Sequence, residues 1–428
     1  MTAPRPGGRV FYGWTIVGTV FVILMVTSGL GFYNASVILS AATDELDVSV
    51  SAVSGATALF FAVSGITGFV LSRQLERRDL RLFYVGGGIV GAVALAGLRW
   101  VDTVALLYVF FALFGIGFAL AGLVPGTTLV TRWFNVRRSI ALSIASTGLS
   151  LGGIAITPVS AWLIDERSLA GAGPILALVW LVGVIPIGVL LIRSRPGEMG
   201  LEPDGATPDR RPTDPPRLVA GATFANARRT RFFVMMCVAY ALIFFAQVGG
   251  LAHLFNVASE RADRPTASTA LSLLALTSVV GRLAGGVIVL RLSTRALSTT
   301  LALFQGLALA LLANANAPWA ILGASVLLGV SVGNLLMLQP LLLAEAFGVA
   351  EYGRIYSFNQ LFSTAGVAGG PVVLGLVHDS ADYRVAFLVA AAASVAGFVS
   401  FLLAGATTRA YAAWDVGTAP RAALLEDP

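Results

Sequence analysis

Cysteine and histidine are almost absent from this 428-residue chain, and lysine does not occur at all. The single cysteine, Cys237, cannot form an internal disulfide or a multi-cysteine metal site. The two histidines, His253 and His378, are too few for a histidine cluster. No nucleophile–base–acid set stands out, and the paired glycines lie in apolar runs where close helix packing explains them. These absences argue against an enzyme, and we expect no metal and no cofactor.

Charge is scarce as well. Only 12% of the residues are charged and 57% are hydrophobic, against about 25% and about 45–50% in soluble domains. A helix of about 20 apolar residues crosses a hydrocarbon core of about 30 Å. We therefore predict an all-α protein embedded in a lipid bilayer. The net charge of +6 comes from arginines scattered between apolar runs, which suits a membrane surface and not nucleic acid.

Twelve apolar runs are long enough to span the membrane, with boundaries good to about four residues. The predicted spans are 11–35, 51–72, 82–99, 104–130, 139–163, 174–192, 231–255, 267–290, 296–313, 318–346, 353–377 and 384–406.

The 28 basic residues are all arginines, and they separate by loop. One, Arg282, falls inside a span. The loops that follow odd-numbered spans hold only five of them: Arg99, Arg167, Arg261, Arg264 and Arg384. The remaining arginines lie in the other loops and the two terminal segments. Because arginine marks the cytoplasmic side, both termini are predicted to lie there, in a multi-pass protein of the inner (plasma) membrane.

The segment 193–230 is rich in proline and charge and is predicted to be a linker without a core of its own. It divides the chain into six spans in 1–192 and six in 231–408. The tail, 409–428, is expected to be a disordered cytoplasmic segment.

The two halves resemble each other. The fourth span and its exit read GIGFALAGLVPGTTLVTRWFNVRR (115–138), and the tenth reads GVSVGNLLMLQPLLLAEAFGVAEYGR (329–354). The fifth and eleventh spans both end with Gly-Gly, then Pro, then Asp. Parallel repeats of this kind predict two pseudo-symmetric six-helix bundles with a substrate site between them, although small residues that favour helix packing can produce similar motifs.

Several short motifs add a family resemblance. They are Phe11-Tyr12-Gly13-Trp14, ERRDLR (76–81), RWFNVRR (132–138), RPGEMGLEPDG (195–205), Gly281-Arg282 and AEAFGVAEYGRIYS (344–357). With these motifs the chain resembles the major facilitator superfamily, and within it the monocarboxylate transporters and oxalate/formate antiporters. The resemblance implies the twelve-helix fold of that superfamily and a secondary-active or facilitative transporter that works by alternating access.

The resemblance also implies that the arginine of the eighth span, here Arg282, anchors the substrate. Two departures weaken an inference about proton coupling. Phe32 stands near the place of a first-span lysine of the animal carriers, and Ser278 replaces their aspartate one turn before the arginine.

Arg282 is the one charge near the middle of a span. An arginine at the bilayer centre costs about 2.5–3.5 kcal/mol on insertion scales, and no carboxylate lies at similar depth. Its planar fork suits bidentate capture of a carboxylate, so we predict a small organic anion, most simply a monocarboxylate, as its partner. The alternative is an arginine that neutralises a helix end or caps a backbone carbonyl.

Other polar residues of the spans could share that site: Asn34, Gln247, Asn334, Asn359 and Gln360. For each one alone, hydrogen bonding between helices is the simpler role. Small polar residues recur at helical spacing in the fifth span, where they either face a cavity or permit close packing: Ser143, Ser146 with Thr147, and Ser150.

Proton coupling has two candidate groups, His253 and Glu345. The alternatives are a histidine at the membrane interface and a charge relay of Glu345 with loop arginines. No Asp or Glu falls near the middle of any span, so a symporter with a buried carboxylate is not predicted. We expect exchange against a counter-anion, facilitated diffusion, or symport in which the substrate and Arg282 share the proton.

Charged residues of the predicted cytoplasmic loops are expected to form a gate of ion pairs that breaks on inward opening. They are Glu76, Arg77, Arg81, Arg137, Arg138 and Arg354. Plain positive-inside topology would explain the arginines equally.

Three other functions are compatible with a helical membrane protein: a drug exporter, a non-transporting sensor and a channel. A drug exporter of the same fold would favour an aromatic cavity with an acidic residue for cations, which the lone arginine argues against. The sequence does not distinguish a transporter from a non-transporting sensor of the same fold. A channel would more often need a ring of subunits or repeated filter loops, whereas we expect this chain to work as a monomer.

Overall fold

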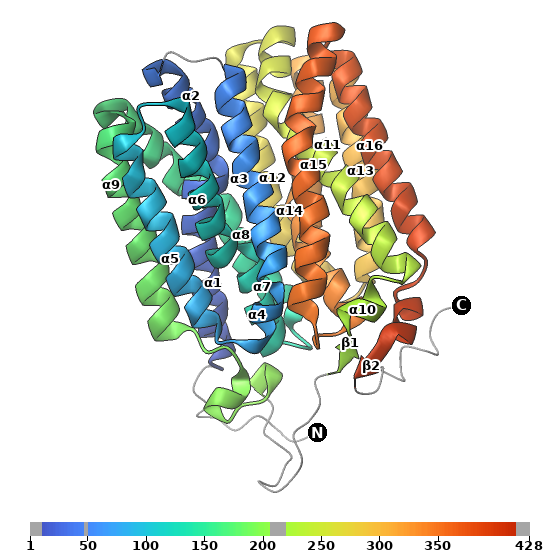
Figure 1. The fold of residues 1–428 in the computed structure, drawn as a ribbon. Coiled ribbons are helices and arrows are strands. Elements are labelled where there is room, and N and C mark those ends of the chain that lie inside the picture. The colour runs from blue at the N-terminus through green and yellow to red at the C-terminus, as the bar shows by residue number, and fades with distance from the viewer. Residues whose placement is uncertain (1–10, 47–49, 206–219, 417–428) are drawn as a thin grey trace, which may run out of the picture.

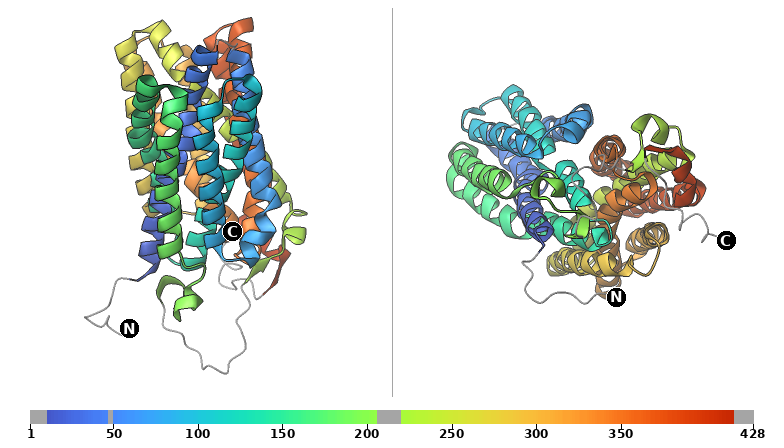
Figure 2. Two further views of the ribbon diagram at one scale, coloured as in Figure 1. Left: turned by 60° about the vertical axis from the view of Figure 1, so that its left-hand side comes forward. Right: turned by 90° about the horizontal axis from the view of Figure 1, so that it is seen from below.

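The computed structural model describes residues 11–46, 50–205 and 220–416, and nearly all of them are helical. The first six spans form one bundle and the last six form a second beside it, as Figure 1 and the view along the helices in Figure 2 show. We call these the N bundle and the C bundle.

The N bundle contains kinked and continuous spans. Its helices are α1 (Gly13–Thr27), η1 (Ser28–Tyr33), α2 (Asn34–Leu46), α3 (Val50–Val70), α5 (Leu80–Gly97), η2 (Leu98–Trp100), α6 (Val104–Ala121), α7 (Leu123–Trp133), α8 (Arg138–Leu151), η3 (Gly152–Ile156) and α9 (Thr157–Leu191).

The C bundle has one helix for each span. They are α11 (Arg231–Arg261), α12 (Arg264–Ile288), α13 (Thr294–Asn314), α14 (Pro318–Phe347), α15 (Tyr352–Ser380) and α16 (Tyr383–Ala404).

The prediction of twelve spans is confirmed. Ten helical runs of the described chain are long and apolar enough to cross a membrane. One of them, Arg138–Leu191, holds two spans, because Ser168 leaves the helical conformation with φ 59° and ψ 173° and the chain turns back there. The shorter apolar helix Gly55–Val70 supplies the remaining span.

The first and fifth spans each contain a π-helical segment, η1 and η3, and the two segments pack against each other. Glycines allow this approach: a Cβ on Gly29 would lie 2.7 Å from the carbonyl oxygen of Gly152. The hydroxyl of Ser28 donates to the Leu149 carbonyl over 2.8 Å. These local distortions have no counterpart in the hydropathy pattern.

Short elements gather on one face of the molecule, which we call the linker side; the opposite face is the far side (Figure 1). They are α4 (Ser72–Arg77), η4 (Pro196–Met199), η5 (Pro203–Gly205), β1 (Gly221–Ala222), α10 (Phe224–Ala227), η6 (Thr407–Ala413) and β2 (Trp414–Val416).

The two described ends of the linker pack on different bundles. On the N bundle, the Asp204 carboxylate accepts the backbone N–H groups of residues 135, 136 and 137 at 2.8–3.2 Å. On the C bundle, β1 pairs with β2 in an antiparallel ladder, and Gly221 also bridges to Gly348. The expectation of a disordered tail is therefore wrong for residues 409–416, which η6 and β2 order against the loop before α15.

Buried apolar residues form two clusters. The larger fills the N bundle and continues into the linker-side half of the C bundle, where Phe233, Leu338 and Tyr356 belong to it. The smaller, with Leu254, Leu309 and Phe387, occupies the far half of the C bundle alone. The hydrophobic core thus crosses between the bundles on the linker side, where they are closed against each other.

Candidate functional site

The bundles meet along two seams in this closed half. In the arginine seam, Ser139, Ser143 and Ser146 of α8 face Arg282 and Gly286 of α12. In the acidic seam, Phe69 of α3 and Glu76 of α4 face Arg354 and Phe358 of α15.

Arg282 is buried inside the arginine seam, with 2% of its surface exposed. Its Nε donates to the Gly333 carbonyl of α14 over 2.7 Å, and its Nη1 donates across the seam to the Ser146 carbonyl. In return, the Ser143 hydroxyl donates to the Arg282 carbonyl over 2.7 Å. Its Nη2 makes no hydrogen bond within the part of the chain that the structure describes. One guanidinium therefore joins three helices from both bundles.

Glycines bring α12 and α14 close enough for the first of these bonds. A Cβ on Gly333 would overlap the Ser278 carbonyl oxygen, and a Cβ on Gly329 would overlap the Thr277 hydroxyl oxygen. Small residues spaced four apart permit such backbone contact between membrane helices. This packing fixes the guanidinium beside the neighbouring bundle.

The charge of Arg282 has no acidic partner among the described residues, where the ion pairs join other groups. The one titratable side chain of the described chain that lies close enough to interact with it electrostatically is Tyr33 of η1, a phenol that is neutral at physiological pH. A carbonyl oxygen accepts a hydrogen bond but carries no formal charge, so the arginine is hydrogen-bonded without being neutralised. Arg282 therefore caps backbone carbonyls, as the alternative interpretation of the sequence expected, and it still lacks the counter-charge that a bound anion would supply.

Asn334 is the predicted site residue placed nearest to Arg282 by its contacts. It follows Gly333, its Nδ2 donates to the Val330 carbonyl over 2.9 Å, and its side chain fills the space beside Gly285. Its Oδ1 is buried without a hydrogen bond to any described residue.

The other predicted polar residues are dispersed. Asn34 lies fully buried at the end of η1, and its amide makes no hydrogen bond inside the described ranges. Gln247 and Gln360 each have a buried, unpartnered side-chain oxygen by the same measure. Asn359 is instead satisfied within the C bundle, donating to the Cys237 sulfur over 3.3 Å and accepting from Gln339 over 2.6 Å. No hydrogen bond among the described residues joins any of these four side chains to Arg282.

The two candidate proton groups also lie apart. His253 sits inside the C bundle, with Nε2 3.0 Å from the Pro371 carbonyl oxygen and its ring 5.9 Å from that of Tyr383. Glu345 lies at the linker-side end of α14, where its carboxylate accepts from the Thr294 hydroxyl over 2.6 Å and senses the charge of Arg138 on the N bundle. Within the described ranges, neither has a hydrogen bond or ion pair with Arg282.

The acidic seam centres on Glu76, whose carboxylate accepts the backbone N–H of Arg354 over 3.0 Å. That N–H lies in the first turn of α15, where a negative charge is favoured by the unpaired donors of a helix start. Burial raises the pKa of Glu76 to about 7, against the pull of the Arg354 N–H, and nearby Glu351 adds to the rise. The positive charges of Arg132 and Arg354 oppose it.

The remaining gate arginines make separate contacts in different parts of the linker side. Arg354 is 3.9 Å from the Glu351 carboxylate and lies over the Phe224 ring. Arg138 bonds locally to the Phe134 carbonyl over 3.0 Å. Arg81 donates to the Ile192 carbonyl over 2.7 Å, inside the N bundle.

Arg77 and Arg137 are exposed. We predicted a network of ion pairs between the bundles. Among the described residues, no side-chain ion pair crosses either seam. The one carboxylate of the described chain that crosses is that of Glu76, which accepts a backbone N–H at the start of α15.

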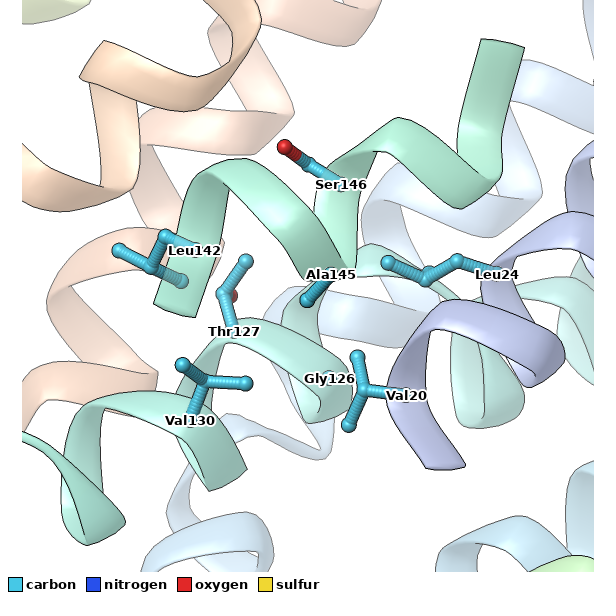
Figure 3. A pocket seen from close by; sticks show the side chains of 8 residues that line it. All are labelled: Val20, Leu24, Gly126, Thr127, Val130, Leu142, Ala145 and Ser146. Atoms are coloured by element: carbon cyan, nitrogen blue, oxygen red, sulfur yellow. The ribbon is translucent and has the colours of Figure 1, made fainter. Parts of the chain in front are cut away.

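A narrow hollow lies behind the arginine seam, between α1, α7 and α8 (Figure 3). Its lining is mostly apolar, with Val20, Leu24, Val130 and Leu142, and it has no room for a water molecule. Figure 3 shows the Ser146 hydroxyl directed away from the other lining side chains. The hollow is a packing gap and not a substrate site.

Sequence reasoning missed several contacts. The Ser146 carbonyl has no sequence signature, because every residue carries one. Asp204 could have been suspected from its place in the RPGEMGLEPDG motif, which has no apolar pattern to explain it. Phe224 packs 6.2 Å from Phe69 and 5.3 Å from Phe358, ring centre to ring centre, and so touches both bundles. A phenylalanine in a polar linker is unusual, and this was the one feature of the sequence that could have indicated a packing role for Phe224.

Comparison with known proteins shows the family to which the chain belongs. Residues 21–297 and 232–423 each match the description of the Major Facilitator Superfamily. Monocarboxylate transporter 13 of Bos taurus is 27% identical over 92% of this chain and 89% of its own length. The protein of the same name from Rattus norvegicus is 26% identical over the same shares.

Among solved structures, the chain resembles a major facilitator transporter, FucP, in the outward conformation. The TM-score is 0.69 at 14% identity, covering 91% of this chain and 98% of that one. A second structure, a single-residue variant of the E. coli fucose:proton symporter FucP, gives a TM-score of 0.59 at 16% identity, covering 92% and 96%. These two structures support the fold alone.

Proposed function

The chain belongs to the major facilitator superfamily, and from this premise we propose that it carries a small organic anion, a monocarboxylate, by alternating access with Arg282 as the carboxylate anchor. The observation that carries the proposal is the buried charge of Arg282, which has hydrogen bonds but no acidic partner in the described chain. A bound carboxylate would supply the missing charge. The relatives named monocarboxylate transporters support this choice of substrate class.

The geometry of the guanidinium supports bidentate binding. Its Nε is held by Gly333 within the C bundle, which fixes the plane of the fork. Its Nη1 donates across the seam to the Ser146 carbonyl, so this end of the fork lies at the junction of the two bundles. Two parallel N–H···O bonds to a carboxylate are stronger and more directional than a bond to a neutral carbonyl. An anion bound there would be accessible to residues of both bundles, as alternating access requires.

The scarcity of buried acidic residues limits how transport can be coupled to a proton gradient. With no Asp or Glu near the middle of any span, we propose exchange, facilitated diffusion, or symport in which the carboxylate itself brings the proton to Arg282. His253 and Glu345 are the remaining candidates for a dedicated proton group. The protein acts as a monomer, with the linker side facing the cytoplasm.

Counterflow into proteoliposomes tests the substrate class. Vesicles preloaded with unlabelled L-lactate should accumulate labelled L-lactate without a pH gradient. Arg282→Ala should abolish this uptake, and Arg282→Lys should reduce it at least tenfold, because a point charge does not reproduce the planar fork.

Arg261 provides the matched control. It also donates to backbone carbonyls, those of Leu312 and Ala313, but it does so on the far side and within one bundle. Arg261→Lys should leave lactate uptake near the wild-type rate. Wild-type uptake in Arg282→Ala would overturn the anchor role, and transport of lipophilic cations in place of lactate would favour the drug exporter.

Orientation is tested by labelling with an impermeant thiol reagent. Cysteines at Asp102, exposed on the far side, and at Gly197, exposed on the linker side, should react from opposite sides of the membrane. The native Cys237 is buried and leaves a low background. Reaction of both from the same side would overturn the topology.

A further inference from the structure

We propose that Arg282 is also a latch: its side chain holds the arginine seam closed, and a bound carboxylate opens the seam by taking the guanidinium from the Ser146 carbonyl. The inference rests on the proposed function only in the identity of the anion. It assigns to Ser143 a gating role separate from substrate binding.

The latch consists of a reciprocal pair of hydrogen bonds. Arg282 donates through Nη1 to the Ser146 carbonyl, and Ser143 donates through its hydroxyl to the Arg282 carbonyl over 2.7 Å. Both bonds join α8 of the N bundle to α12 of the C bundle, within one helical turn on each side. All three residues are at least 97% buried, so water does not reach the pair to replace either bond.

The helices are in contact around this pair. A Cβ on Gly286 would lie 2.5 Å from the Ser143 Cβ and 3.4 Å from the Ser139 carbonyl oxygen. Nothing larger than hydrogen fits at that point of α12. An anion therefore cannot enter between the helices while the seam is closed, and its binding at Nη1 must accompany separation of the two helices.

Competition for the guanidinium gives the coupling its direction. The Ser146 carbonyl engages Nη1 in the closed seam, and a carboxylate that binds through Nη1 and Nη2 would compete with it for that nitrogen. An ionised acceptor forms the stronger bond with a charged donor. The anion thus binds more tightly when the seam is open and the guanidinium is free, and a ligand shifts an equilibrium toward the state it binds better. Binding at the anchor thereby favours opening on the linker side.

Ser143 allows the two roles of Arg282 to be separated. Ser143→Ala removes the hydroxyl that holds the Arg282 carbonyl, and it leaves the guanidinium intact. This variant should weaken the latch while the anchor still binds its carboxylate. Ser139→Ala is the matched control, because Ser139 lies one turn away on the same face and its hydroxyl makes no bond across the seam among the described residues.

The experiment measures the distance across the arginine seam on the linker side. Spin labels are placed on the full chain at Val136 and Leu292, which are 76% and 56% exposed at the ends of α8 and α12, with Cys237 replaced by Ala. Pulsed electron resonance in nanodiscs then reports the open fraction with sodium L-lactate and with the uncharged lactamide.

Three results are expected. L-lactate should increase the long-distance population of the otherwise native protein, and lactamide should not. Ser143→Ala should raise that population several-fold without any ligand and should bind L-lactate as tightly as the native protein or a few-fold more tightly. Arg282→Gln should also raise it and should then fail to respond to L-lactate. Ser139→Ala should behave like the native protein.

The outcomes that overturn the latch differ from those that overturn the anchor. L-lactate that binds without changing the distances, or a Ser143→Ala distance distribution equal to that of Ser139→Ala, would refute the latch and leave the anchor intact. Failure of L-lactate to bind the native protein would refute the proposed substrate, whereas the ligand-free distances in Ser143→Ala would still decide whether the latch exists. Because Ser143→Ala keeps the arginine, the decision does not depend on folding of the Arg282 variant.

Discussion

The two seams occupy equivalent places in a pseudo-symmetric molecule, yet they are held by different chemistry. The acidic seam joins the second span to the eleventh through a carboxylate on a helix start and a group of phenylalanine rings. The arginine seam joins the fifth to the eighth through serine, carbonyl and guanidinium groups. The first contains a group that titrates near neutrality, and the second contains a charge that is permanent at physiological pH.

We therefore expect the two seams to respond to different inputs to one movement. Opening on the linker side requires both seams to part. The acidic seam can respond to protons at the membrane surface, because Glu76 lies outside the spans. The arginine seam can respond only to something that competes for the guanidinium. Variants of one seam should therefore change pH dependence, and variants of the other should change anion dependence.

Among variants that keep Arg282, the largest effect should come from Gly333→Ala, which disturbs the arginine seam from its α14 side. The new Cβ would overlap the Ser278 carbonyl oxygen, so α14 must move away from α12 and Arg282 must lose its Gly333 partner. Overpacking of this kind costs about 1–3 kcal/mol. We expect a lower Tm and at least a tenfold loss of lactate counterflow.

Gly323→Ala is its control on the same helix, because a Cβ there meets no atom within 4 Å. An alanine in an open helical position should maintain or raise stability, by about 0.5–1 kcal/mol. Equal behaviour of the two variants would show that the close approach of α12 and α14 is dispensable.

The acidic seam should show its character in pH dependence, tested with Glu76→Gln. In the closed seam the pKa of Glu76 is about 7, whereas in an open, hydrated seam it would lie near the ordinary 4.5. The closed state thus binds the proton more tightly. Its contribution to closure is complete below about pH 4.5 and is lost as the pH rises through about 7.

The measurement is the distance between spin labels on the linker side as a function of pH. The open fraction of the native protein should rise between pH 4.5 and 7, and the Glu76→Gln curve should be flat over that window. Ser143→Ala should keep the native pH dependence with a higher baseline. A native-like pH curve in Glu76→Gln would place the titrating group elsewhere.

A smaller effect is expected from Phe224→Leu, which removes aromatic contact from the linker-side edge of the acidic seam. Its ring packs on Phe69 and Phe358 and lies 4.7 Å below the Arg354 guanidinium. Aromatic pairs contribute about 0.5–1.5 kcal/mol beyond burial, so Tm should fall by a few degrees and the open fraction should rise slightly. Phe304→Leu, at a 41% exposed position on α13, should change neither.

The smallest effect should follow Trp414→Phe. The Trp414 indole N–H donates to the Ala346 carbonyl over 2.9 Å and holds β2 under the loop before α15. Loss of one such bond costs about 0.5–1.5 kcal/mol, which a careful thermal unfolding series can resolve. Trp319→Phe, at a 78% exposed position, is the control. A larger loss than that of Gly333→Ala would mean that the tail contributes more to the fold than the seam does.

The spans and their grouping could be predicted from the sequence, because a bilayer requires about 20 apolar residues for each helix and the arginine-rich linker interrupts that pattern once. The turn at Ser168 and the π-helical segment at Gly152 could not be predicted, since they change backbone conformation without changing hydropathy. Ser143 was placed on one helical face by its spacing, but its partner, a backbone carbonyl in another span, has no signature in the sequence.

The candidate site was predicted at its centre and less well around it. Arg282 stood out because charge is rare at its depth. Asn359 looked similar to Asn334 in the sequence, yet the rotation of α15 turns it toward Cys237 and Gln339, while Asn334 lies against α12 beside Arg282. Hydropathy does not fix helix rotation when a helix is apolar on most faces, so it cannot separate a cavity residue from one that bonds within its bundle.

The linker is fastened at both described ends, by Asp204 to the N bundle and by β1 to the C bundle. A chain cut between residues 205 and 220 would therefore yield two fragments, each carrying its own linker-side contacts. Co-expressed, they would have to recognise each other through the seams alone. The dissociation constant of the two fragments would then measure the free energy of the contacts across the closed seams. Each seam variant would change this constant by the amount that its residue contributes.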